Sequence, residues 1–182
     1  EPQNLEQRRA SAGRRASEEK IQDIAFFGDS SVGLEGFFNS PQIDKVVPNK
    51  WFTDSATTTD EMIDLLNEPA TRIVSNSRQK ERPNTLLLDL ASYRKISTTP
   101  RSSTSDTTVL EFFLRTNPYI RSVEPINELS AANGQLSKDR MIAYDRSPDK
   151  LQLHLPKTLQ FLPPIRAALE FSVTAMAHVG RV

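Results

Sequence analysis

Apolar and polar residues alternate along this chain in blocks that predict short strands from residue 21 onward. The run IQDIAFF (residues 21–27) is short, apolar and followed by a glycine, which predicts a strand. KVVPNKWF (residues 45–52) predicts a second, weaker strand, because it contains Pro48. NTLLLDL (residues 84–90) is nearly continuous in apolar residues, as in a strand covered on both faces. RMIAYD (residues 140–145) predicts a last short strand.

Helical signals occupy the segments between these runs. Thr58 and Glu61 have the spacing of a capping box at the start of TTDEMIDLL, whose apolar residues share one helical face. Pro69 is expected to begin a second helix that continues to about Arg78. EPINELSAANG (residues 124–134) has a proline at its start and a glycine at its end, which predicts a further helix.

Three other segments complete the predicted order of elements. STTPRSSTSDTT (residues 97–108) consists of turn-forming residues and predicts a surface loop. VLEFFLRTNP (residues 109–118) is interpreted as a strand, with a short helix as the open alternative. From Phe161 onward, apolar residues recur at helical spacing, which predicts an amphipathic helix that closes the core. Its apolar stripe comprises Ile165, Ala168, Leu169, Ser172, Met176 and Val179, and the opposite face carries Arg166, Glu170, Thr174 and His178.

The alternation of strands and helices determines the expected fold class. It is typical of a three-layer α/β domain, in which helices flank a mainly parallel sheet as in flavodoxin-like folds. The length of the chain suits one such domain, which we place at residues 20–182. Residues 1–19 are polar and charged without apolar periodicity, so we expect a flexible charged arm there.

The arm contains the pattern Arg-Arg-Ala-Ser twice, ending at Ser11 and at Ser17. The pattern resembles the site preferred by basophilic kinases and therefore predicts phosphorylation of these two serines. Phosphate groups at these positions would change the sign of the local charge. The alternative interpretation is a solvated arm that docks on a protein partner.

The composition of the chain excludes several kinds of partner and several kinds of site. The 23 basic and 23 acidic residues give a formal net charge of zero, so neither nucleic acid nor an anionic membrane surface is predicted as a partner. No apolar run is long enough to span a bilayer, and the first residues do not resemble a signal peptide, so we expect a soluble protein of unassigned compartment. The absence of cysteine excludes disulfides, thiolate metal sites and a cysteine nucleophile. No cluster has metal-ligand spacing, and no cofactor is predicted.

The candidate chemistry begins in IAFFGDSSVG (residues 24–33), where the apolar run stops at Gly-Asp-Ser. At the carboxyl edge of a sheet, a tight turn would expose the hydroxyl of Ser30, and the backbone N–H groups after it would face a developing oxyanion. A serine nucleophile needs a base. His154 precedes the predicted terminal helix and is the candidate base, whereas His178 is expected on the solvated face of that helix. Asp149 and Asp145 lie close upstream as candidate orienting carboxylates.

The spacing of the acid and the base favours a dyad over a full triad. Asp149 and His154 are five positions apart, and extended backbone at roughly 3.3 Å per residue would separate them by about 16 Å. We therefore favour Ser30 with His154 alone.

The motifs follow one another in a characteristic order: Gly-Asp-Ser after the first strand, TDSATTTDEMIDLL at the next helix, NTLLLDL as a central strand, INELSAANGQ and RMIAYD, then a late Asp and His. This order resembles the SGNH (GDSL-type) hydrolase superfamily over about residues 21–175. The resemblance implies an SGNH-like fold with Ser30 as the nucleophile and Asp149 and His154 as acid and base. Two blocks depart from the family pattern. Ser55 and its neighbour replace a glycine, and DLASYRK replaces Gly-x-Asn-Asp.

Two hypotheses follow. In the first, the protein is a serine hydrolase, an esterase or O-acyl (acetyl) esterase acting on a small or glycan-linked ester, with Gly33, Ser55 and Ser92 as oxyanion or substrate-binding groups. In the second, it is a catalytically inactive SGNH-like structural or interaction module that docks a partner through residues 1–19. Gly-Asp-Ser with a late histidine favours the enzyme, and the missing oxyanion donors favour the module. The sequence prediction is the hydrolase.

Overall fold

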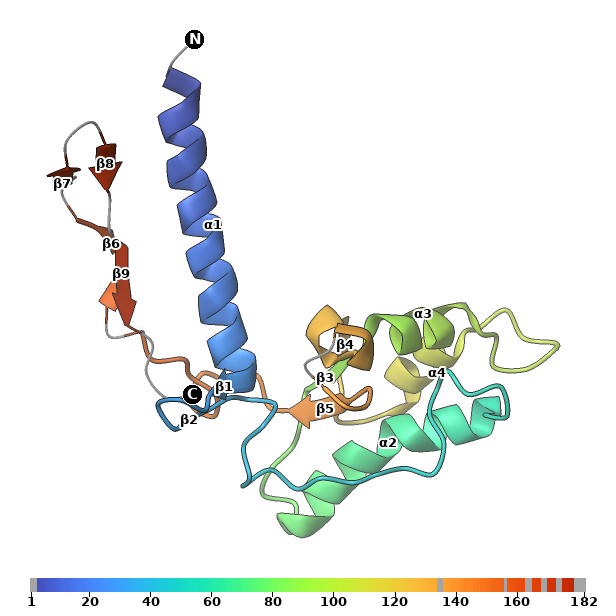
Figure 1. Cartoon of the computed structure of the whole chain (residues 1–182). Coiled ribbons are helices and arrows are strands. Elements are labelled where there is room, and N and C mark those ends of the chain that lie inside the picture. The colour runs from blue at the N-terminus through green and yellow to red at the C-terminus, as the bar shows by residue number, and fades with distance from the viewer. Residues whose placement is uncertain are drawn as a thin grey trace. The chain divides into compact units, whose positions relative to one another are not determined.

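The computed structural model (Figure 1) describes residues 3–133, 136–155, 157–162, 165–167, 170–172 and 175–178. The chain divides into two compact units. The first unit combines residues 1–45 with residues 151–182, and the second comprises residues 46–150. Each unit has its own secondary structure and its own pattern of burial.

The second unit is built on a three-stranded sheet with a buried central strand. β3 (Thr85–Leu88) lies between β4 (Ser122–Pro125) and β5 (Met141–Tyr144). It runs parallel to β4 and antiparallel to β5. All four residues of β3 are buried, and because successive side chains of a strand point to opposite faces, both faces of β3 are covered. The strands predicted for residues 84–90 and 140–145 are confirmed.

The helix α2 (Thr59–Asn76) begins at the predicted capping box and continues past Pro69. Thr58 Oγ1 accepts the Glu61 N–H, and the Glu61 carboxylate accepts the Thr58 N–H. The buried stripe of α2, on both sides of the proline, comprises Met62, Leu66, Ala70 and Val74. Burial of a large apolar side chain contributes about 1.5–3 kcal/mol, whereas an interior proline costs about 3 kcal/mol. The stripe outweighs the proline, so the prediction of a second helix at Pro69 is wrong.

The helices α3 (Leu90–Thr98) and α4 (Val109–Thr116) complete the cover of the sheet (Figure 1). Asp89 caps α3 through a hydrogen bond from a backbone N–H of its first turn. In α4, Val109 and Phe113 are buried at a spacing of one helical turn. The interpretation of residues 109–118 as a strand is wrong, and the open alternative, a short helix, forms. It begins at a capping box of Thr108 and Glu111.

The buried apolar residues of the second unit form one core. It comprises Phe52, Met62, Leu66, Ala70, Leu86, Leu88, Ile96, Val109, Phe113, Ile120 and Val123. The strand predicted for residues 45–52 does not form, although Phe52 at its end enters this core. The helix predicted for residues 124–134 is replaced by two 3-10 turns, η1 (Asn127–Leu129) and η2 (Ala131–Asn133).

The first unit begins with α1 (Gln3–Phe27), a helix of 25 residues. A short antiparallel hairpin of β1 (Gly28–Asp29) and β2 (Leu34–Glu35) follows it. The strand predicted for residues 21–27 is wrong, because its apolar residues also fit the spacing of a helical face. The helix crosses residue 19 without a break, and the division of the chain at that residue stays a prediction.

The end of α1 is held by a close approach between Gly28 and Gly36. A Cβ atom on Gly36 would lie 2.2 Å from the backbone nitrogen of Gly28. Gly28 itself has φ of +75°, a left-handed conformation that favours glycine. Beyond the glycines, the ring of Phe38 stacks on that of Phe26, with centroids 4.6 Å apart. These contacts tie the hairpin to the last turn of the helix.

The described C-terminal residues form strands. β6 (Lys157–Phe161) pairs antiparallel with β9 (Ala175–His178), and β7 (Ile165–Ala167) pairs antiparallel with β8 (Glu170–Ser172). The amphipathic helix predicted from Phe161 is therefore wrong for the described residues, where the sequence also alternates apolar and polar residues with the period of a strand. Of the residues named for the two faces of the predicted helix, four lie outside the described residues: Ala168, Leu169, Thr174 and Val179.

The expected three-layer α/β fold with a mainly parallel sheet is wrong. Among the described strands, β3 and β4 form the one parallel pair, and the other pairs are antiparallel. The reason is local: of the runs interpreted as strands, residues 21–27 and 109–118 form helices and residues 45–52 are irregular, so too few strands remain for a large parallel sheet.

We predict that Gly36→Ala opens the junction at the end of α1, because the added Cβ meets backbone that cannot move aside. The N–H groups of Phe37 and Phe38 donate to carbonyls of α1 at 2.9 and 2.8 Å, and hydrogen exchange of these amides measures the effect. Protection should be lost in this variant. Gly33→Ala is the matched control, because a Cβ there meets nothing within 4 Å and its φ of +69° alone adds a cost of about 1–2 kcal/mol. Equal protection in the two variants would contradict the prediction.

We also predict a pH-dependent contribution of Glu61 to stability. The hydrogen bond from Lys50 Nζ and the bond from the Thr58 N–H lower the pKa of Glu61 from 4.5 to about 2. A carboxyl group whose pKa is lowered by folding stabilises the protein above its unfolded pKa, and this stabilisation is lost as the pH falls toward the folded pKa. The difference in unfolding free energy between the wild type and Glu61→Gln should therefore be full above pH 4.5 and should shrink between pH 4.5 and about 2.

Urea unfolding at stepped pH measures this difference. Glu68→Gln is the control, because Glu68 lies on the same helix outside the cap. A difference for Glu61→Gln that is constant from pH 5 to pH 2 would show that the charge of Glu61 does not act through the cap.

Candidate functional site

Ser30 lies in an exposed turn at the tip of the β1–β2 hairpin. The neighbouring Asp29 organises this turn, since its Oδ1 accepts the Ser31 N–H at 3.0 Å and the Ser31 hydroxyl at 2.6 Å. These hydrogen bonds from Ser31 lower the pKa of Asp29. Gly-Asp-Ser is therefore a turn motif here, with its carboxylate bonded to the residue after Ser30.

His154 and Asp149 are both exposed, and neither lies in a helix or a strand. Asp149 belongs to the second unit, whereas Ser30 and His154 belong to the first. Among the described residues, no hydrogen bond or ion pair joins any two of these three side chains. Upstream of Asp149, the carboxylate of Asp145 is fixed by a hydrogen bond that it accepts from Asn84 Nδ2 at 2.5 Å.

The three candidate oxyanion groups differ in their surroundings. The Gly33 N–H donates to the carbonyl of Ser30 at 3.4 Å, within the hairpin turn. Ser55 lies in an exposed turn before α2. Ser92 is buried in the first turn of α3, where its N–H donates to Asp89 Oδ2 at 2.9 Å. Two of the three N–H groups are thus engaged within the protein.

Asp89 and Ser92 form the most buried polar pair of the second unit. Both are fully buried, and neither Asp89 Oδ1 nor the Ser92 hydroxyl has a hydrogen-bond partner within the described part of the chain. In the comparison with the SGNH pattern, this segment stands where Gly-x-Asn-Asp is expected. Asp89 caps α3 directly after β3. An isolated Asp before a helical run was the sequence signal for this cap.

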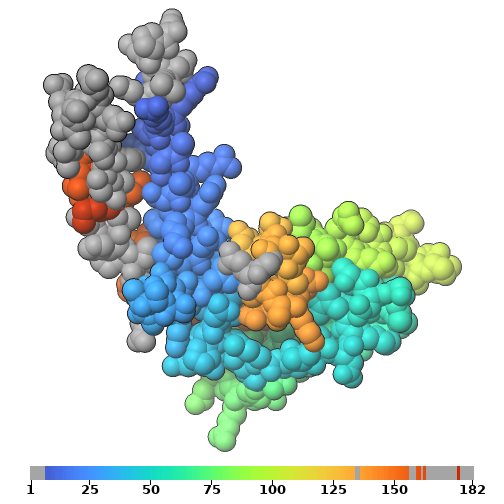
Figure 2. Space-filling view, in the orientation of Figure 1, coloured from blue at the N-terminus to red at the C-terminus, as the bar shows by residue number. Residues whose placement is uncertain are grey.

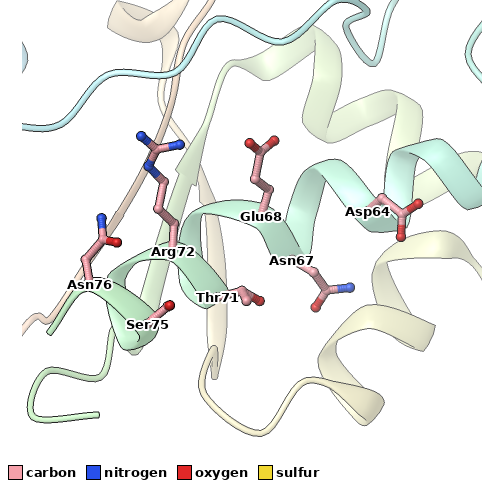
Figure 3. A pocket seen from close by; sticks show the side chains of 7 residues that line it. All are labelled: Asp64, Asn67, Glu68, Thr71, Arg72, Ser75 and Asn76. Atoms are coloured by element: carbon pink, nitrogen blue, oxygen red, sulfur yellow. The ribbon is translucent and has the colours of Figure 1, made fainter. Parts of the chain in front are cut away.

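Two hollows mark the surface of the second unit. One, of about 620 Å³, runs along α2 and is lined by polar residues of that helix alone (Figure 3): Asp64, Asn67, Glu68, Thr71, Arg72, Ser75 and Asn76. The other, of about 390 Å³, lies where β3 begins and β5 ends, and includes Asn84, Tyr119 and Asp145. Neither contains a histidine or any of the predicted catalytic residues. No group of three or more potential metal ligands occurs in the described ranges.

The comparisons with known proteins point away from an enzyme. A family model described as "Major capsid protein" matches residues 2–182. The solved structure "The capsid of Myoviridae Phage XM1" has the same fold, with a TM-score of 0.76 at 14% sequence identity. The match covers 98% of this chain and 62% of that chain, so this chain spans less than two thirds of the capsid chain it resembles. No curated protein matches the sequence.

These findings correct several sequence predictions. The resemblance to the SGNH hydrolases is wrong, and with it the serine hydrolase function, the esterase activity and the ester substrate. The physical reason is that Gly-Asp-Ser ends a helix and opens a hairpin turn, and does not follow a parallel strand. In the part of the chain that the structure describes, no helix is long and apolar enough to cross a membrane.

We predict that the protein does not hydrolyse esters through Ser30. Wild type and Ser30→Ala should release p-nitrophenol from p-nitrophenyl acetate at the rate of the buffer blank, because no base is hydrogen-bonded to this hydroxyl. The measurement is the absorbance of p-nitrophenolate with time. A wild-type rate above the blank that disappears in Ser30→Ala would contradict the prediction.

Proposed function

The chain belongs to the major capsid protein family, and from that membership we propose that it is a structural subunit of a phage capsid shell. In this role it assembles with further copies of itself and catalyses no reaction. The match of the family model over nearly the whole chain carries the proposal, and the shared fold with a phage capsid chain supports it. The distribution of apolar residues gives a physical argument for the same conclusion.

The first unit buries very little of its own apolar surface. Among the side chains whose burial the structure describes, Phe38 is the one large apolar residue of this unit that is buried, whereas the second unit has a core of many. Burial of apolar surface is the main favourable term in folding. A unit with so small a core gains stability by burying its surface against neighbouring subunits, as a shell subunit does.

Exposed apolar side chains concentrate in or next to the first unit. They include Val32, Ile43, Val46, Val47, Leu153, Leu155, Leu162 and Met176. Val46 and Val47 are adjacent, 42% and 73% exposed, and outside any helix or strand. Contiguous exposed apolar residues mark interaction sites in soluble proteins. This pattern supports self-association through the segment around Val47.

The strands of the first unit support the same proposal. The pairs β6–β9 and β7–β8 are each two-stranded among the described residues. Isolated two-stranded sheets are marginally stable in water, and their open edges present unpaired backbone groups that accept a further strand. Contacts between subunits would cover these edges.

We predict that the purified chain assembles into large particles and that V46K/V47K weakens this assembly. Two lysines on this segment would place charge where the proposal requires apolar contact. Size-exclusion chromatography with light scattering measures the mass, and negative-stain electron microscopy shows the particles. A wild-type chain that stays monomeric at every concentration would contradict the proposed function.

The matched control is S103K/T104K, which adds the same charge to an exposed polar loop. It should assemble as the wild type does. If V46K/V47K and the control assemble equally well, the segment around Val47 is not a contact between subunits.

A further inference from the structure

The N-terminal half of α1 carries a concentrated positive charge. The stretch from Gln7 to Ser17 contains four arginines and no acidic residue: Arg8, Arg9, Arg14 and Arg15. All residues from 7 to 16 are exposed, and the blue side chains of α1 lie at the surface in Figure 2. The zero net charge of the whole chain hides this local excess.

The arginines form one block within α1. Glu6 precedes them, Glu18, Glu19, Lys20 and Asp23 follow them, and the last turn contains no basic residue. The positive charge is therefore concentrated between two acidic segments of the same helix.

Helical geometry spreads these arginines over more than half of the circumference of α1. At 100° and about 1.5 Å per residue, Arg8 and Arg15 share a face and lie about 10 Å apart along the axis, with Arg9 and Arg14 on either side of it. Arg15 pairs with Glu19 at 3.0 Å, but both side chains are largely exposed, and such surface pairs are easily exchanged for another partner. The surface therefore suits an extended polyanion.

Resting on the proposed capsid function, we propose that this surface, Arg8 to Arg15 on α1, binds the phosphate backbone of nucleic acid enclosed by the shell. Guanidinium groups form paired hydrogen bonds with phosphate oxygens and stay charged at every physiological pH. Such contacts do not depend on base sequence. The sequence prediction that excluded nucleic acid used the total charge alone, whereas phosphate contacts depend on local charge.

Of the two serines of the Arg-Arg-Ala-Ser repeats, Ser11 lies between Arg8 and Arg14 around the helix, whereas Ser17 lies on the side opposite Arg8. The Ser11 hydroxyl donates to the carbonyl of Arg8, and the Ser17 hydroxyl donates to that of Gly13, both at 2.9 Å. Their phosphorylation stays a prediction. A phosphate adds about −1.5 to −2 charges at neutral pH, so modification of either serine would offset nearly half of the four arginine charges.

The test measures binding of the full chain to a fluorescent 30-base-pair DNA duplex by anisotropy. If all four arginines contact phosphates, affinity should fall by roughly 100-fold between 50 and 200 mM NaCl. The variant R8Q/R9Q/R14Q/R15Q should bind at least tenfold more weakly at 50 mM NaCl and should lose most of this salt dependence. Glutamine keeps a helix propensity close to that of arginine, so circular dichroism should show an intact helix.

The matched control is R82Q/R94Q/R115Q/R121Q, which removes the same charge from exposed positions of the second unit. It should bind the duplex as the wild type does. Two substitutions at Ser11 test the effect of a negative charge. Ser11→Asp should reduce the affinity for the duplex, whereas Ser11→Ala should leave it unchanged.

Unchanged duplex binding in the α1 variant would overturn the proposal. Loss of self-association without loss of DNA binding would also overturn it, because the arginines would then face an acidic surface of another copy. A chain that binds DNA through α1 but never assembles would contradict the proposed function alone. A chain that assembles but binds no duplex would contradict this inference alone.

Discussion

The burial of β3 is the interaction on which the second unit depends. Its four residues are inaccessible, paired on one edge with β4 and on the other with β5, and packed between helices whose own buried stripes reach the same core. The following residue, Asp89, turns the chain from this strand into α3 by capping its first turn. Because strand, cap and helix are consecutive, a displacement of β3 would remove the cap and part of the core together. The second unit therefore has the cooperativity of a self-contained folding unit.

The first unit lacks an equivalent centre. In its described residues the tightest packing is the close approach of Gly28 and Gly36, with Phe38 stacked on Phe26 at the end of α1. These contacts fix a junction, but they bury little area compared with the core of the other unit. The two units therefore differ in the size of their cores. The second unit has the large core, although Val46, Val47 and Leu90 of this unit are exposed, whereas the first unit has a small core and open strand edges. In the proposed shell subunit, contacts with other copies would therefore matter most for the stability of the first unit.

Local signals predicted the second unit well and the first unit poorly, for a physical reason. The capping box at Thr58 and the continuous apolar run of β3 are determined by neighbours in the sequence, and both are confirmed. At residues 21–27 and beyond Phe161, the apolar spacing fits both a helix and a strand, and tertiary packing decides between them. Gly-Asp-Ser gave a wrong prediction because this tripeptide occurs in turns as well as in catalytic motifs. Here it forms a turn, in which Asp29 accepts a hydrogen bond from Ser31. The proposed contacts with another subunit would leave no local signal comparable to a cap.

The arginine block of α1 and the small core of the first unit have a common consequence. An exposed block of like charges and strands with open edges both have free energy to gain from a partner. When folding and association are linked in this way, stability rises with the concentration of the partner. The apparent stability of the first unit should then depend on protein concentration more strongly than that of the second unit, which has the larger core. Assembly would thus stabilise the part of the chain that lacks a core, and the part that has one would fold before any contact forms.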